Sequence, residues 1–255
     1  MYLVDIHSHV LYGMDDGPKT LEVAQAMIEM AAASGTTHLV ATPHANSNYT
    51  FDPALIRERL AELRALAPAG IELCTGCDFH LSVDNIEDAI RSPRKYTINQ
   101  GKYLLVEFSD LMIFPTTAQI FSRLQDAGMV PIITHPERND LLRYRLEQMS
   151  EWVDNGALIQ VTGQSLSGHF GRRAKAFSEE LLNRRMVHFI ASDGHDLKHR
   201  PPKMDEAYSI LTEQYGESAA NKLCKANPRA VVENGRVDPL PADAVRTRKW
   251  FQVWR

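Results

Sequence analysis

The stretch that decides the fold is Tyr2-Leu3-Val4-Asp5-Ile6-His7-Ser8-His9, near the start of the 255-residue chain. Tyr2–Ile6 is a short, mostly apolar run, which predicts a buried β-strand. Side chains of an extended segment alternate between two faces, so His7 and His9 should point to the same face. Two imidazoles on one face can chelate one divalent ion. The first strand therefore predicts both a buried sheet and a metal site at its end.

Six further runs of this kind alternate with longer, helix-like segments. Runs this apolar predict strands buried on both faces, as in a parallel sheet. Seven βα units predict an α/β fold in a single domain, either a closed barrel or an open doubly wound sheet. No Gly-x-Gly-x-x-Gly follows the first strand, which disfavours a dinucleotide-binding fold. The six runs are Thr37–Ala41, Ile71–Thr75, Tyr103–Glu107, Val130–Thr134, Ala157–Val161 and Val187–Ala191.

Amphipathic patterns predict helices between these strands. Thr20–Ser34 carries an apolar stripe. Asp52 and Pro53 suit the N-cap and first position of a second helix. Thr116 and Gln119 predict a capping box for a third. Weaker helical patterns lie near 146–155, 173–184, 204–214 and 217–225.

The composition excludes several classes of protein. The chain has 28 basic and 32 acidic residues, which argues against a nucleic-acid binder. It has three cysteines, an odd number that favours a reducing compartment. The N-terminus lacks a basic region followed by an apolar stretch, and no stretch reaches 18 apolar residues. We therefore expect a cytoplasmic protein without membrane insertion.

The last twenty residues leave the alternating pattern. Segment 236–255 carries Trp250, Phe251 and Trp254 among basic residues. We expect this tail either to pack back on the domain formed by residues 1–235 or to form an oligomer or partner contact.

Metal-binding residue types follow six of the seven predicted strands. In βα folds, chemistry collects at the carboxyl ends of the strands. Five histidines and four carboxylates are too many for one ion, so two or three divalent ions are expected, with Mn, Fe or Zn suited to this mixed set. Clustered divalent ions activate water and clamp phosphoryl groups. The residues are His7, His9, Asp16, His44, Asp78, Glu107, His135, Asp193 and His195.

Two arginines point to a phosphate ester as substrate. Arg138 follows His135 on the same strand-end loop, and Arg200 follows His195. A guanidinium can fork onto two phosphate oxygens. A cysteine-dependent phosphatase would need an arginine six positions after its cysteine. Six positions after the three cysteines stand His80, Val83 and Ala230. None is arginine, so a phosphocysteine mechanism is not supported.

These motifs together resemble the PHP (polymerase and histidinol phosphatase) superfamily. More narrowly, they resemble the bacterial capsule and exopolysaccharide tyrosine phosphatases of the CpsB/CapC/YwqE type, over about residues 1–234. The narrower resemblance is carried by Asp15-Asp16-Gly17-Pro18 and Arg200-Pro201-Pro202. The other motifs are Asp5-Ile6-His7-Ser8-His9, Ala41-Thr42-Pro43-His44, His135-Pro136-Glu137-Arg138 and Ser192-Asp193-Gly194-His195.

The resemblance implies a distorted (β/α)7 TIM-like barrel, the PHP fold, over residues 1–235. It also implies a three-metal site, commonly supported by manganese. Arg138 and Arg200 would hold the phosphate. The family usually has glutamate where this chain has Asp78. The three ions would take His7, His9, Asp78 and Asp193; Asp78, Glu107 and His135; and Asp16, His44 and His195.

The function implied is hydrolysis of phosphotyrosine on the tail of a bacterial tyrosine autokinase that controls capsule or exopolysaccharide synthesis. A metal-bound hydroxide would attack phosphorus, and His44 or His195 would supply a proton. Three alternatives stay open. They are a phosphoesterase for a small molecule such as histidinol phosphate, a C–N hydrolase of amidohydrolase type, and a catalytically weak regulatory protein. Glu107 disfavours the second, because amidohydrolases usually carry a lysine on a middle strand.

Overall fold

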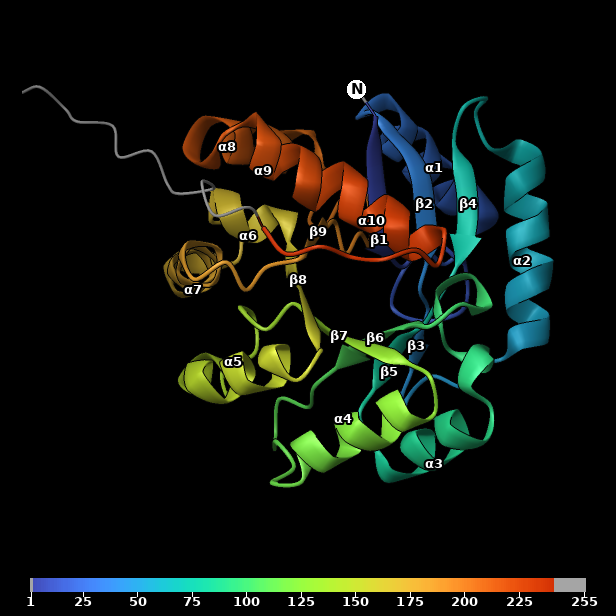
Figure 1. The fold of residues 1–255 in the computed structure, drawn as a ribbon. Helices are drawn as coiled ribbons and strands as arrows, with labels where there is room; N and C mark the ends of the chain where they lie inside the picture. The colour runs from blue at the N-terminus through green and yellow to red at the C-terminus, as the bar shows by residue number, and fades with distance from the viewer. Residues whose placement is uncertain (1, 241–255) are drawn as a thin grey trace, which may run out of the picture.

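The computed structural model describes residues 2–240 (Figure 1). Most of the predicted tail, from residue 241 on, lies outside the described residues. The described part of that tail packs on the body, since Leu240 is buried in the main apolar cluster and the Asn227 side chain donates to the backbone oxygen of Asp238. Within residues 2–240 no helix combines the length and apolar character needed to cross a membrane.

Every predicted strand is present, and two of them are each followed by a short further strand that was not predicted. The short strands β3 and β5 continue β2 and β4 after interruptions at Thr42-Pro43 and Gly76-Cys77. A side chain at Gly76 would meet Thr42, Val40 and Ile98 at 3.0–3.2 Å, so glycine lets these neighbours pack closely at this break. The strands are β1 (Leu3–Ser8), β2 (Thr36–Ala41), β3 (His44–Ala45), β4 (Glu72–Thr75), β5 (Asp78–His80), β6 (Tyr103–Glu107), β7 (Val130–Thr134), β8 (Leu158–Thr162) and β9 (Phe189–Ala191).

The strands form two parallel sheets, as the sequence predicts for an α/β fold. One sheet has the order β1-β2-β4, and the other has the order β3-β5-β6-β7-β8-β9. An isolated parallel bridge joins Ser8, at the end of β1, to Gly194, just after β9. The carboxyl ends of all these strands therefore face one side of the molecule.

Helices cover the outer faces of the sheets (Figure 1). Asp52 caps α2 through its side chain, as predicted, and Thr20 caps α1 in the same way. The predicted capping box of α4 is wrong, because the Thr116 side chain makes no capping hydrogen bond. The patterns did not predict α3, α6 or α10. The helices are α1 (Leu21–Ala33), α2 (Pro53–Leu66), α3 (Val83–Arg91), α4 (Thr117–Asp126), α5 (Leu146–Asp154), α6 (Gly163–Ser167), α7 (Gly171–Asn183), α8 (Asp205–Tyr215), α9 (Glu217–Asn221) and α10 (Asn227–Val232).

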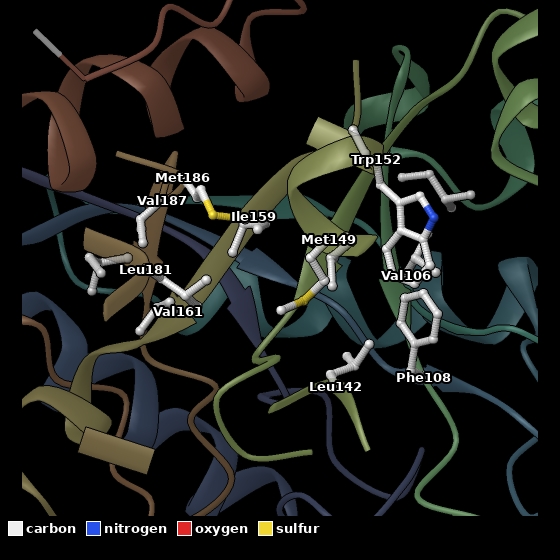
Figure 2. Packing of buried hydrophobic residues seen from close by; sticks show 14 of the residues in the cluster. Val106, Phe108, Leu142, Met149, Trp152, Ile159, Val161, Leu181, Met186 and Val187 are labelled. Carbon is white, nitrogen blue, oxygen red and sulfur yellow. The ribbon is translucent and has the colours of Figure 1, made fainter. Parts of the chain in front are cut away.

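Packing behind the sheet fixes the strand ends that carry polar residues. Trp152 of α5 stacks on Phe108, with ring centroids 5.6 Å apart and planes 10° apart (Figure 2). Phe121 of α4 meets both rings edge-on. Phe108 directly follows Glu107, the last residue of β6. This aromatic cluster therefore holds the end of β6 in place beneath Glu107.

One buried histidine gives the fold a defined acid sensitivity. His188 accepts a hydrogen bond at Nδ1 from the Ile159 backbone N–H at 3.1 Å, and burial lowers its pKa from 6.5 to about 4. The unfolded chain therefore binds a proton on His188 more readily than the folded chain does.

We expect the free energy of unfolding to fall as pH drops from 6.5 towards 4, with about 2–3 kcal/mol of the loss due to His188. Asparagine keeps the acceptor but cannot be protonated, so His188→Asn should lose less stability between pH 7.5 and 4.5 in urea titrations. His169→Asn, at an exposed position, is the control, and equal pH slopes in His188→Asn and the parent would contradict the assignment.

Candidate active site

All nine predicted metal-binding residues lie together at the carboxyl ends of the strands. His7 lies in β1, His44 in β3 and Asp78 in β5, and Glu107 ends β6. The other five come from the loops after β1, β7 and β9. His7, His9, Asp78 and Asp193 are buried, whereas the side chains of Asp16 and Glu107 are 46% and 21% exposed. The cluster therefore has a buried floor and a mouth that opens to solvent.

The two histidines of the first motif point at each other, as their spacing predicts. His7 Nδ1 donates to Gln160 Oε1 at 2.9 Å, and His9 Nδ1 donates to Asp15 Oδ2 at 2.7 Å. These contacts place a proton on Nδ1 of each ring and turn the two Nε2 atoms towards each other, 3.2 Å apart. Metal-binding histidines are typically oriented in this way by a partner of the second ring nitrogen.

Several buried atoms of the cluster lack a hydrogen-bond partner. Buried polar atoms are nearly always satisfied, so such a concentration needs a physical reason. Each of these atoms carries a lone pair of the kind that binds divalent ions. The residues present therefore fit metal ions. Among the described residues the atoms are His44 Nδ1, Asp78 Oδ2, Asp193 Oδ1 and His195 Nε2.

The nine side chains form four overlapping groups in which the ligand atoms lie within 4.8 Å of one another. His9 joins the group implied for the third ion. Glu107 groups with His44 and Asp78, while its Oε1 lies 3.8 Å from His135 Nε2. The groups are His9, Asp16, His44 and His195; His7, Asp78 and His135; His7, His9 and Asp193; and His44, Asp78 and Glu107.

The Asp78 side chain reaches the centre of the cluster although it is one methylene shorter than glutamate. Its Oδ2 lies 3.2 Å from His44 Nδ1, 3.5 Å from His7 Nε2 and 3.9 Å from His9 Nε2. The departure from the family pattern thus leaves a carboxylate oxygen facing three imidazoles.

Asp193 connects the histidines to the two arginines. Its Oδ1 lies 3.4 Å from His7 Nε2 and 3.5 Å from His9 Nε2. Its Oδ2 accepts hydrogen bonds from Arg138 Nη1 and from Arg200 Nη2, the latter at 2.5 Å. Both guanidiniums are only about a quarter exposed, and Arg138 also lies over the Phe170 ring at 4.5 Å. Two forked cations thus border the candidate metal site.

The electrostatics of the floor favour a positive charge on His7 and oppose one on His135 and His195. Burial opposes charging of His7, but the carboxylates of Asp78 and Asp193 raise its pKa to about 9. Burial also opposes ionisation of Asp193, yet Arg138 and His7 hold its pKa well below the usual range. At His135, burial and the charge of Arg138 lower the pKa to about 3, which keeps its lone pairs available. At His195, burial and the charge of His9 lower the pKa to about 4.

Two of these residues hold a backbone conformation that is costly for side chains other than glycine. His135 has φ +34° and Asp193 has φ +51°. Strain of this kind persists where the surroundings over-determine the backbone, and it clusters at functional sites. The neighbouring Gly194 has no room for a side chain, since a Cβ there would lie 2.6 Å from Pro202.

Four positioning residues were not assigned from the sequence. Asp15 and Gln160 orient His9 and His7. Asp5 accepts from the backbone N–H groups of His7 and Ser192, and so ties β1 to the end of β9. Glu137 accepts from Ser165 Oγ at 2.6 Å and from the Thr162 N–H. Asp5, Asp15 and Glu137 belong to the quoted motifs, but no pattern showed which way their side chains point.

The cysteines take no part in the cluster. All three are free and buried, and burial raises the pKa of each thiol. A nucleophilic cysteine needs the opposite shift.

Residues 3–233 match the family model of capsular polysaccharide synthesis proteins CpsB/CapC. The chain belongs to this family. It is 32% identical over 253 residues to the tyrosine-protein phosphatase YwqE of Bacillus subtilis, covering 98% of this chain and 99% of the relative. It is 30% identical over 239 residues to the tyrosine-protein phosphatase CpsB of Streptococcus pneumoniae, covering 90% and 98%.

Solved structures agree with this assignment. One from the work on YwqE and CpsB, described as metal-dependent tyrosine phosphatases, superposes with a TM-score of 0.84 at 30% identity, covering 98% of this chain and all of that one. The phosphotriesterase homology protein of Escherichia coli has a TM-score of 0.55 at 10% identity, covering 91% and 98%. That second likeness shows a shared fold alone.

Gln160 offers a test of the metal site that leaves the candidate ligands intact. Its amide oxygen orients His7, and its Nε2 has no hydrogen-bond partner, so leucine removes only the contact to His7. We expect Gln160→Leu to weaken Mn²⁺ binding about 10–100-fold, measured by calorimetry on metal-stripped protein. Gln164→Leu, at a glutamine whose Oε1 is also unpartnered, is the matched control. Equal affinities in both variants would show that the Gln160 contact does not support metal binding by His7.

Proposed function

We propose that this chain is a metal-dependent protein tyrosine phosphatase. The observation that carries the proposal is the arrangement around Asp193, where imidazoles face one oxygen and two guanidiniums face the other. Such a site offers ligands for divalent ions on one side and a fork for phosphate oxygens on the other. The similarity to YwqE and CpsB over nearly the whole chain supports the same activity.

We assign the nine clustered residues as metal ligands, with Mn²⁺ as the first ion to try. Divalent ions bound there would activate a water molecule and polarise a phosphoryl group. Arg138 and Arg200 would hold the outer phosphate oxygens. A phenolate, with a solution pKa of about 10, is a comparatively good leaving group, so it needs less help from a general acid than an alkoxide does. His44 or His195 would supply that proton only where its ring is not fully committed to a metal ion. The buried floor would exclude bulk water from the reacting centre.

We further propose that the two sheets form one distorted (β/α)7 barrel over residues 1–235. Three features support this. β3 and β5 continue β2 and β4, each neighbouring pair is parallel, and the Ser8–Gly194 bridge lies between the first and last strands. A ring of this kind would bring all the strand ends around one centre.

The partner that we propose is the phosphotyrosyl tail of a bacterial tyrosine kinase acting in capsule or exopolysaccharide synthesis, in the cytoplasm. The family description and the names of the relatives support a phosphotyrosyl protein in this process. The two alternatives that share the metal set are hydrolysis of a small alkyl phosphate and binding without turnover.

Phosphate release from three substrates tests the function directly. We expect metal-stripped protein to be inactive and Mn²⁺ to restore turnover of a phosphotyrosyl peptide, but not of a phosphoseryl peptide or histidinol phosphate. His7→Ala with Asp193→Ala should lower turnover at least about 100-fold because it removes ligand atoms at the centre. Faster turnover of histidinol phosphate would point to a metabolic enzyme. Bound metal without any turnover would point to a regulatory protein.

The arginines can be tested without removing their charge. We expect Arg138→Lys and Arg200→Lys each to lower kcat/KM for the phosphotyrosyl peptide about 10–100-fold, because lysine cannot form the planar fork. Metal content should stay the same, since each lysine keeps a cation beside Asp193. Arg143→Lys, at an arginine on the same loop that pairs with Asp140, is the control. Unchanged kinetics in both test variants would place the phosphate elsewhere.

A further inference from the structure

Exposed apolar side chains lie on the segments that follow three of the strands bearing the candidate active site. Among the described residues, six large hydrophobic side chains are exposed, and four of them follow the adjacent strands β5, β6 and β7. Isolated exposed apolar residues are ordinary, but a concentration marks an interaction surface. We call this set the apolar rim: Val83, Leu111, Met112 and Tyr144, exposed by 65%, 91%, 52% and 85%.

Asn139 fixes the apolar rim relative to the phosphate-binding residues. It directly follows Arg138, and its Nδ2 donates to the Ser109 backbone oxygen and to Asp110 Oδ1, both at 3.1 Å. Its Oδ1 accepts from the backbone N–H groups of Leu141 and Leu142. The loops that carry Leu111 and Tyr144 are therefore tied together beside Arg138 through Asn139.

Basic side chains predominate on the loops after the next two strands, β8 and β9, although the loop after β9 also carries Asp196. Phe170 lies against Arg138, and the exposed Arg172 and Arg173 follow it at the start of α7. Neither has a carboxylate within ion-pair distance in the described part of the chain. Lys198 and His199, also exposed, directly precede Arg200. We call Arg172, Arg173, Lys198 and His199 the basic rim.

We propose that the two rims together bind a phosphotyrosyl polypeptide segment that has apolar residues on one side of the phosphotyrosine and acidic residues on the other. This rests on the proposed function. A small phosphate ester could fill the buried floor but would not extend over loops from five strands. Charge complementarity places the acidic flank over the basic rim. The exposed Asp110, beside Leu111, repels an acidic flank from the apolar rim and so gives the surface a direction.

Peptide flanks test this surface separately from the chemistry. Three phosphotyrosyl peptides are compared on the Mn²⁺-loaded enzyme. The first has acidic residues before the phosphotyrosine and apolar residues after it, the second has the reverse order, and the third has Gly/Ser on both flanks. One of the two directional peptides should exceed the Gly/Ser peptide in kcat/KM by about tenfold, through KM. Leu111→Ser with Met112→Ser should remove the gain from the apolar flank. Arg172→Gln with Arg173→Gln should remove the gain from the acidic flank.

Matched controls come from the same chain. Leu66→Ser changes an exposed leucine on α2, and Arg184→Gln with Arg185→Gln changes the Arg-Arg pair just past the other end of α7. Turnover of p-nitrophenyl phosphate reports the proposed function alone and should be the same in all variants. Peptide binding, followed by fluorescence anisotropy, reports the rims even without turnover. Equal kcat/KM and equal binding for the three peptides, or equal effects of test and control variants, would overturn the proposal.

Discussion

The rest of the site depends on the ion pairs and hydrogen bonds that the buried carboxylate of Asp193 makes. It is almost completely buried, and a buried charge is stable only when it is paired on every side. Imidazoles face one oxygen, guanidiniums face the other, and the Asp193 N–H donates to the His7 backbone oxygen at 2.9 Å. The same residue therefore holds the end of β9 against β1, orients the arginines and contributes to the proposed metal site. Its left-handed backbone is the cost of meeting these three demands.

The concentration of charge on the floor couples stability to metal loading. Asp78 and Asp193 are ionised in a region with little solvent, and the facing histidines cannot all be protonated without repelling one another and the two arginines. Divalent ions would replace those protons and satisfy the unpartnered lone pairs at once. Since ions that bind only the folded chain also stabilise it, a metal-stripped protein should lose resistance to unfolding together with activity. A substitution that weakens metal binding should therefore lower both the stability of the fold and the activity.

Much of the fold and the choice of candidate ligands could be predicted from the sequence, because both depend on local patterns. Apolar runs predicted the strands, and polar residues directly after them predicted the side chains that the structure brings together. The residues that orient the candidate ligands, such as Gln160, could not be predicted from local patterns. Gln160 lies within a strand far from His7 in sequence, and only the pairing of β8 with its neighbours reveals their contact. The short helix α6 was missed because Glu137, from another loop, accepts from the Thr162 and Ser165 groups at its start.

The division between floor and rim explains how one fold can serve different substrates. Side chains on the floor come from strand ends, where packing such as the Phe108–Trp152 stack leaves little freedom. They recognise metal ions and a phosphoryl group, features that all phosphate monoesters share, so at the floor only the leaving group separates a tyrosyl phosphate from an alkyl phosphate. The loops beyond the strand ends carry exposed residues that the core does not constrain. Selection among phosphotyrosyl substrates must therefore come from these loops, whose apolar and basic halves differ in the chemistry that they can bind.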